Sequence, residues 1–214
     1  MRKMRLLFQK TGRAIYLSHL DLMRVFQTAF TRAEVPLWFT EGFNPHPYIS
    51  PITPLPVGVA SEYELLDFNT EAEFDLQAAC VRLSERLPEG LLVSEMYEAV
   101  LAPKQLCKAS YTIRISSDNS EALAARCLAL FAQDSVFVQK RTKSGDKMID
   151  IKPQIFALSV VSEAEAIVVE LMAALSGESV FNPLIFVKAL EISEEQLYSV
   201  TKTALYAKDG SVFR

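Results

Sequence analysis

The amino-acid sequence predicts an α+β fold, and three observations lead to this prediction. Strand-like segments alternate with segments of helical period, and the alternation is partly repeated along the chain. The length of 214 residues suits one large domain or two small ones. Hydrophobic residues make up 50% of the chain and charged residues 22%, values typical of globular proteins, so the chain can bury a core without disulfides or metals.

The first hundred residues are expected to follow the order β-α-β-β-α-β, which is the ferredoxin-like split βαβ pattern. Ser18 is a suitable N-cap for the first helix, and Leu22, Phe26 and Phe30 recur at the helical period and predict its buried face. Pro36 predicts the end of this helix. The expected elements are strands at 4–9, 37–40, 63–69 and 91–100, a short extended stretch at 14–17, and helices from 18 to about 34 and at 75–87.

The second half is expected to repeat this pattern irregularly after a linker at 102–109. The sequence therefore predicts two ferredoxin-like units in tandem, with domains at 1–101 and 102–214. A hairpin turn is expected at Lys143 to Asp146, and Asn182-Pro183 is a typical helix start. The expected elements are strands at 111–116, 136–142, 148–161, 167–173 and 197–207, and helices at 120–132 and 182–190.

The three cysteines do not suggest a disulfide framework or a zinc knuckle, because their number is odd and no C-x-x-C occurs. Cys80 and Cys127 lie among apolar residues and are expected to be ordinary core thiols. No stretch approaches the roughly 18 apolar residues of a membrane span, and no apolar signal core follows the basic N-terminus. A cytoplasmic protein without membrane contact is therefore expected.

Charge is distributed unevenly, although the net charge is only −4. Residues 1–50 carry seven Lys or Arg against three Asp or Glu, whereas residues 51–100 carry two against ten. The chain as a whole lacks the basic excess that a general grip on nucleic acid needs, but its first fifty residues could supply a local basic surface. An ordinary solvated surface explains the same charges equally well.

Motifs of the common cofactor-binding and hydrolytic sites are missing from the sequence. There is no G-x-x-x-x-G-K-[ST] loop, no G-x-G-x-x-G and no G-x-S-x-G nucleophile elbow. A cysteine run that could ligate an iron–sulfur cluster is also missing, so the chain is not expected to be a radical enzyme itself. We expect no bound cofactor.

The two histidines of the chain lie in its two most unusual segments. His19 follows the N-cap Ser18, with Asp21 at a capping-box spacing, and His46 lies between two prolines in the proline-rich loop 41–60. One strand separates helix and loop, so both rings are expected on one accessible surface, where histidine suits proton transfer. Alternatively, His19 caps or packs and backbone hydrogen bonds hold His46. A metal site would need a third ligand that the sequence does not place.

Aromatic residues gather around the loop beside the basic segment. Trp38, Phe39, Phe43 and Tyr48 could stack on bases, as in proteins that hold single-stranded RNA. The cations nearby in sequence are Arg13, Arg24 and Arg32. The alternative is that these aromatics belong to the core. Phe39 and Phe43 are the residues for which a core position is most expected.

Several motifs resemble the radical-SAM-linked protein family, a domain family of unknown function found beside or fused to a radical S-adenosylmethionine protein. The matching segments are LSHLDLMR at 17–24, TEGFNPHPYIS at 40–50, LPVG at 55–58, DIKP at 150–153 and TKTALY at 201–206. The resemblance covers nearly the whole chain. Two departures weaken a phosphate contact: members often have a basic residue at the position of Tyr48 and a glutamine at that of Glu41.

The resemblance implies a radical S-adenosylmethionine protein as partner. Our first hypothesis is therefore a non-catalytic accessory module that presents a substrate, such as RNA, to this partner. The alternatives are a histidine-dependent RNA-processing or RNA-modifying enzyme and a purely structural docking subunit. The expected binding surface comprises Ser18, His19, Asp21, Arg24, Gly42, Phe43, Asn44, His46 and Tyr48.

Overall fold

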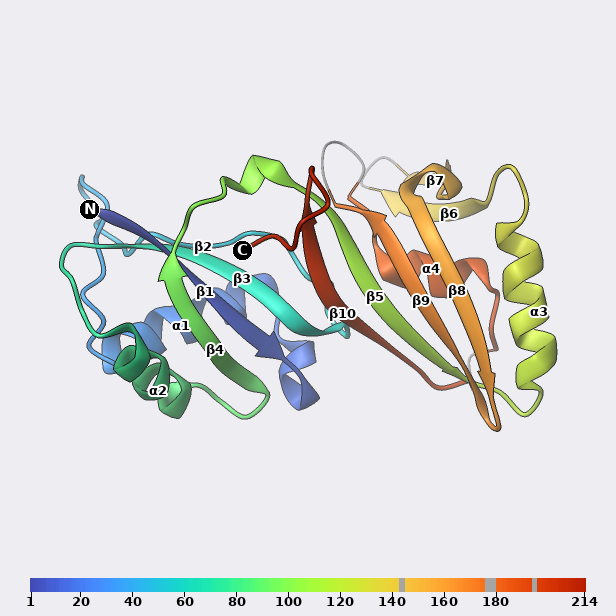
Figure 1. Ribbon diagram of the computed structural model, residues 1–214, viewed down its shortest axis with the longest axis horizontal. Coiled ribbons are helices and arrows are strands. Elements are labelled where there is room, and N and C mark those ends of the chain that lie inside the picture. Colours follow the sequence, from blue (N-terminus) through green and yellow to red (C-terminus); the bar gives the residue numbers. More distant parts are fainter. Residues whose placement is uncertain (143–144, 176–179, 194–195) are drawn as a thin grey trace. The chain divides into compact units, whose positions relative to one another are not determined.

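The computed structural model describes residues 1–142, 145–175, 180–193 and 196–214. The chain divides into two compact units: unit 1 is Met1–Pro103 together with Arg214, and unit 2 is Lys104–Phe213. Each unit combines antiparallel strands with helices, so the chain has an α+β fold, as predicted (Figure 1).

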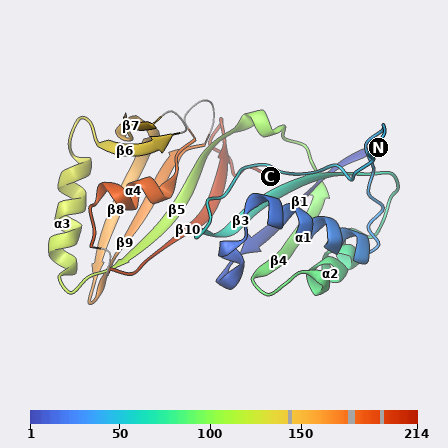
Figure 2. The same ribbon diagram turned by 180° about the vertical axis from the view of Figure 1, so that it is seen from behind.

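Unit 1 is an antiparallel sheet with two helices on one face. Strand β1 pairs with β3 on one side and with β4 on the other, and the short strand β2 pairs with β3, which gives the order β4-β1-β3-β2. Figure 2 shows α1 and α2 side by side over this sheet. The elements are β1 (Arg2–Lys10), a 3₁₀ turn (Gly12–Tyr16), α1 (His19–Arg32), β2 (Ile49–Pro51), β3 (Ala60–Thr70), α2 (Leu76–Arg86) and β4 (Leu91–Glu98).

The core of unit 1 lies between the sheet and these helices. Because side chains alternate along a strand, every second residue of β1 faces the helices. Phe8 of β1 packs edge-on against Phe26 of α1, with ring centroids 4.8 Å apart, and Phe30 lies 4.9 Å from Phe68 of β3. Phe26 and Phe30 are both fully buried, so the helical period predicted the buried face of α1 correctly.

Unit 2 repeats the connection order of unit 1 among its own antiparallel strands. Its strands pair in the order β10-β5-β9-β8, and the hairpin β6-β7 is inserted between α3 and β8. The elements are β5 (Leu106–Ser116), α3 (Ser120–Phe131), β6 (Phe137–Thr142), β7 (Gly145–Asp150), a 3₁₀ turn (Lys152–Gln154), β8 (Ile155–Glu163), β9 (Ala166–Ala174), α4 (Pro183–Ala189) and β10 (Tyr198–Ala207). Helix α3 packs on β8 and β9.

Prolines explain two of the wrong element predictions. Residues 37–40 do not form a strand but only the isolated bridges Leu37–Thr70 and Phe39–Pro47, and the strand that pairs with β3 is β2, inside the proline-rich loop. The strand predicted at 148–161 is split into β7 and β8, because Pro153 lacks an N–H and lies in a 3₁₀ turn between them.

Two further predictions are wrong, the extended stretch at 14–17 and the linker at 102–109. The stretch 14–17 is not extended, since Gly12–Tyr16 forms a 3₁₀ turn. The expected linker at 102–109 is mostly structured, because β5 begins at Leu106. The hairpin turn predicted at Lys143 to Asp146 falls partly on Lys143 and Ser144, which lie outside the described residues.

The cysteines are free thiols in different environments. Cys127 is fully buried, and this burial raises the pKa of its thiol to about 11, as expected for a core thiol. Cys80 is only half-buried, so its assignment to the core holds in part, although burial still raises the pKa of its thiol. Within the described part of the chain, helices long and apolar enough to cross a membrane are not found.

Candidate functional site

The start of α1 is built by reciprocal hydrogen bonds between Ser18 and Asp21. The Ser18 hydroxyl accepts the backbone N–H of Asp21 at 3.2 Å and donates to the Asp21 carboxylate at 2.6 Å. The same carboxylate lies 3.4 Å from the guanidinium of Arg24. Ser18 is therefore the N-cap, and the Asp21 carboxylate supports it by accepting a hydrogen bond from its hydroxyl, while Arg24 stays mostly exposed about one helical turn further on.

The segment leading into α1 is fixed by a buried lysine. The Lys10 ammonium donates to the carbonyl oxygens of Ile15 and Leu17 at 3.2 and 3.1 Å, and the Gly58 N–H donates to the same Ile15 carbonyl at 2.9 Å. The LPVG motif therefore lies beside the segment that precedes the LSHLDLMR helix. His19 is exposed there and makes no side-chain hydrogen bond or ion pair with the residues that the structure describes.

The TEGFNPHP motif forms a loop closed by hydrogen bonds between Thr40 and His46. The Thr40 N–H donates to the His46 carbonyl at 2.9 Å, and the His46 N–H donates to the Thr40 hydroxyl at 3.2 Å. The Tyr48 N–H donates to the Trp38 carbonyl at 3.2 Å. The closed loop presents Gly42, Phe43 and Asn44, all of which are exposed.

The ring of His46 is oriented by the same loop. Its Nδ1 lies 3.1 Å from both the Asn44 carbonyl oxygen and the Thr40 hydroxyl. A carbonyl oxygen can only accept, so the hydrogen bond to Asn44 requires a proton on Nδ1. In the neutral ring, Nε2 is then unprotonated and available as an acceptor.

This geometry predicts that neutral His46 occupies the Nδ1–H tautomer in solution. A ¹⁵N-resolved histidine spectrum above the titration range should show Nδ1 as the protonated nitrogen of His46. His19 is the matched control, because no hydrogen bond within the described residues fixes its tautomer. Thr40→Val should loosen the loop and move His46 toward the mixed tautomers of His19. A dominant Nε2–H form of wild-type His46 would contradict the assignment.

The two histidines do not share one surface, which corrects the sequence-based expectation. His19 follows the segment that is held by Lys10, at the end of β1. The loop that contains His46 is attached near the start of β1, because the Trp38 and Tyr48 backbones are hydrogen-bonded to Asn69, which is paired with Lys3. Lys3 and Lys10 are seven residues apart on this extended strand, a distance of about 23 Å. The helix-start residues and the loop residues thus form two separate surfaces at opposite ends of unit 1.

The aromatic residues around the loop are more exposed than expected. Phe39 is 46% exposed and Phe43 is fully exposed, so the expectation that both belong to the core is wrong. Tyr48 is also exposed, and Trp38 is half-buried. Phe39 lies next to Pro47 in an isolated bridge, where the irregular backbone turns its side chain outward rather than into the core between sheet and helices.

A groove of about 720 Å³ between α1 and α2 was not predicted from the sequence. Arg24 and Arg32 of α1 and Arg86 of α2 line it, so the groove contains one residue of the expected binding surface. Arg32 and Arg86 are exposed and make no hydrogen bond or ion pair within the described part of the protein. Arg86 is far from Arg24 and Arg32 in the sequence, and only the packing of the two helices brings these cations together.

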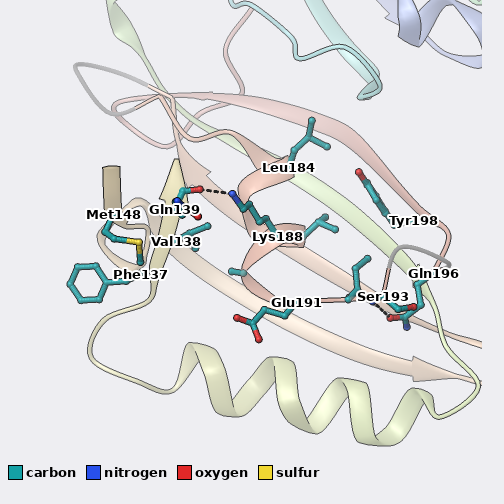
Figure 3. A pocket seen from close by; sticks show the side chains of 13 residues that line it. Phe137, Val138, Gln139, Met148, Leu184, Lys188, Glu191, Ser193, Gln196 and Tyr198 are labelled. Atoms are coloured by element: carbon teal, nitrogen blue, oxygen red, sulfur yellow. Dashed lines mark hydrogen bonds between the residues drawn. The ribbon is translucent and has the colours of Figure 1, made fainter. Parts of the chain in front are cut away.

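Unit 2 contains another unpredicted pocket, of about 630 Å³, between the hairpin β6-β7, helix α4 and the segment leading to β10 (Figure 3). Lys188 points toward Gln139 and donates to its backbone carbonyl at 2.6 Å, and the Gln196 side chain accepts the Ser193 N–H at 3.0 Å. Lys188 and Ser193 therefore each bond to another residue of this lining, while the Gln196 side-chain nitrogen donates to the Ser116 carbonyl outside it. Across the described ranges, no cluster of three or more His, Cys, Asp or Glu side chains is placed to hold a metal ion.

Comparisons with known proteins identify a matching sequence family and a solved structure of similar fold. A family described as "Uncharacterized protein conserved in bacteria (DUF2344)" matches residues 3–183. No curated protein matches the sequence. A chain from the crystal structure of a Cbf5-Nop10-Gar1 complex is similar in fold, with a TM-score of 0.52 and 8% sequence identity. The similarity covers 94% of the present protein but only 48% of the chain from the complex.

A protein of unknown function from Galdieria sulphuraria matches over 94% of this chain and 98% of its own, at 11% identity. Its TM-score is 0.29, which is too low to support any statement about fold. At 8% identity, the likeness to the chain of the Cbf5-Nop10-Gar1 complex concerns the fold alone.

Proposed function

The chain belongs to this bacterial family, and we propose that it works as a non-catalytic accessory module that holds an RNA substrate for a partner radical S-adenosylmethionine protein. The partner follows from the sequence motifs, which resemble the radical-SAM-linked family. The observation that carries the proposal is the fully exposed Phe43 at the tip of a loop that hydrogen bonds hold in shape.

Exposed aromatics on a fixed loop favour a role in protein binding. Phe39, Phe43 and Tyr48 are all exposed within ten residues of sequence, and Thr40 and His46 close the loop between them. Aromatic side chains bury a large apolar area at a low loss of conformational entropy, and they are enriched among the residues that dominate binding energy at interfaces. A preordered loop reduces the entropy lost on association. This loop is therefore the surface at which we place the partner.

The positions of the histidines favour an accessory role over a histidine-dependent enzyme. General acid–base catalysis by a histidine pair needs both rings within hydrogen-bonding reach of one substrate. His19 and His46 lie at opposite ends of unit 1, so a pair mechanism is not supported. Each histidine could still contact RNA or partner by itself, as the expected binding surface implies.

The strand order supports two finer readings. Both units connect their strands in the same sequence, with orders β4-β1-β3-β2 and β10-β5-β9-β8, which is the order expected for two ferredoxin-like units in tandem, the second with an inserted hairpin. We propose the domains at 1–101 and 102–214 on this basis.

The free cysteines are in keeping with a reducing cytoplasm.

Phe43→Ala should weaken binding to the purified radical S-adenosylmethionine protein from the same cell at least about tenfold, a typical effect of removing a dominant interface residue. The affinity is measured by titration calorimetry with the full chain. Phe137→Ala is the matched control, because Phe137 is also an exposed phenylalanine but lies on unit 2. Melting curves of both variants should match the wild type, since neither side chain is part of the core.

Three outcomes separate the candidate functions. No affinity of the wild-type chain for the radical protein would reject the accessory role. Turnover of RNA by the isolated chain, abolished by His19→Ala or His46→Ala with binding intact, would establish the enzyme alternative. Binding to the radical protein that depends on Phe43, without any affinity for RNA, would leave the purely structural docking subunit.

A further inference from the structure

We propose that the groove between α1 and α2 binds the sugar–phosphate backbone of an RNA strand through Arg24, Arg32 and Arg86. This inference rests on the proposed RNA role and adds the place and the chemistry of the contact. It concerns a surface distinct from the loop around Phe43, so the two can be tested separately.

The groove is a fixed feature of unit 1. The Arg82 side chain donates to the Ala33 carbonyl at 3.0 Å, which ties α2 to the end of α1. Val25 and Leu87 form an apolar floor, and both pack against the buried core. The walls therefore keep their spacing without a ligand, and the exposed arginines project from a rigid support.

The cations line the groove at separate places along its length. Arg24 and Arg32 are eight residues apart on one helix, which corresponds to about 12 Å along its axis, and the exposed Thr28 lies between them. Arg86 comes from the last turn of α2. Arg32 and Arg86 each lie in the last turn of a helix, where the helix dipole favours a positive charge. The dipole does not explain why both side chains line the same groove as Arg24.

The donors and acceptors of the groove favour a phosphodiester backbone over an acidic peptide. The guanidinium groups supply many N–H donors in a fork that matches phosphate oxygens, whereas the groove-lining acceptors are Glu85 and Thr28. A peptide would bring its own backbone N–H groups, which need acceptors, and along α1 around Val25 and Thr28 the carbonyls are already used within the helix. A sugar–phosphate backbone carries no N–H group and mainly needs donors.

The proposed contact does not depend on the base sequence. Among the residues that the structure describes, no aromatic side chain lines the groove, so bases are not stacked there, and the arginines meet only phosphate and sugar. Unit 1 is otherwise rich in carboxylates, which repel phosphate, so the attraction between protein and RNA is limited to the groove. With two to three phosphate contacts, the slope of log K against log salt should be roughly −2 for a single strand.

The test measures binding of a short labelled oligo(U) RNA to the full chain by fluorescence anisotropy, between about 50 and 200 mM salt. Arg32→Gln and Arg86→Gln should each weaken binding about tenfold and reduce the magnitude of the salt slope by roughly 0.7. Both residues are exposed and without a protein partner in the described structure, so folding should be unaffected. Arg2→Gln is the matched control, since Arg2 of the same unit pairs with Glu73 away from the groove.

A variant of opposite sign sharpens the test. Glu85→Gln removes the carboxylate that lines the groove and should strengthen RNA binding roughly threefold, by relief of like-charge repulsion. Damage to the fold would weaken binding instead. The two arginine variants should leave binding to the radical protein unchanged.

Each remaining outcome decides the proposal. Normal RNA binding by the Arg32→Gln/Arg86→Gln double variant would overturn the groove assignment but leave the RNA role intact. Equal or tighter binding of a poly-glutamate peptide, with the same dependence on the arginines, would identify an acidic protein segment instead. No RNA binding by the wild type would overturn the inference and the RNA part of the proposed function, whereas Phe43-dependent binding of the radical protein would still stand.

Discussion

Gly90→Ala should destabilise unit 1 by about 3 kcal/mol, because the new methyl group has no room and the backbone conformation disfavours it. Gly90 has φ +91°, and a Cβ there would lie 2.3 Å from the Thr11 carbonyl oxygen and 3.0 Å from the Ala14 Cβ. The Gly90 carbonyl also accepts the Thr11 N–H at 2.8 Å, so the two backbones cannot separate without breaking this bond.

Gly58→Ala is the matched control for the clash. Gly58 has nearly the same conformation, φ +87°, but nothing lies within 4 Å of a Cβ placed there. Its replacement should cost only about 1 kcal/mol, the penalty of a left-handed backbone. Trp38, the single tryptophan, lies half-buried in unit 1, so its fluorescence during urea unfolding reports on this unit. Equal losses for the two variants would show that the clash is relieved by a small backbone shift.

Periodic segments were predictable because their pattern is set by local geometry and burial. The apolar spacing of Leu22, Phe26 and Phe30 located α1, and the caps Ser18 and Asn182 marked helix starts that the structure also shows. The segments around Pro36 to Pro51 were not predictable in the same way. There the missing N–H groups of the prolines and the register with β3, rather than local propensity, decide which residues pair.

The candidate site was predictable only in part, because sequence proximity is a poor guide to distance across a helix. His19 and His46 are separated by α1, which carries the chain about 20 Å along the sheet, so the two surfaces diverge. The cap formed by Ser18 and Asp21 depends on neighbours in sequence and was found. The groove depends on Arg86, which is more than fifty residues from Arg32, and only the packing of α2 on α1 joins them.

Asp67→Ala should destabilise unit 1 by about 3 kcal/mol, because it removes the bidentate partner of a fully buried arginine. Arg5 of β1 is 0% exposed and donates to the two carboxylate oxygens of Asp67 at 2.6 and 2.9 Å, and to the Leu101 carbonyl at 2.9 Å. A guanidinium inside a protein loses its hydration, and the carboxylate compensates for this loss through short charge-assisted bonds. Loss of the carboxylate leaves that desolvation penalty in place.

An exposed ion pair of the same unit provides the comparison. Arg2 and Glu73 approach to 2.8 Å, but their side chains are 45% and 86% exposed, so Glu73→Ala should change the free energy of unfolding by less than about 1 kcal/mol. Both variants remove one carboxylate from the same sheet, and both are followed by Trp38 fluorescence in urea. Added salt should reduce the small effect of Glu73→Ala and leave the large effect of Asp67→Ala almost unchanged, since screening acts on exposed charges. Similar small losses for both variants would show that burial gives the Arg5–Asp67 pair no special weight, and that the remaining contacts of Arg5 suffice to hold it in place.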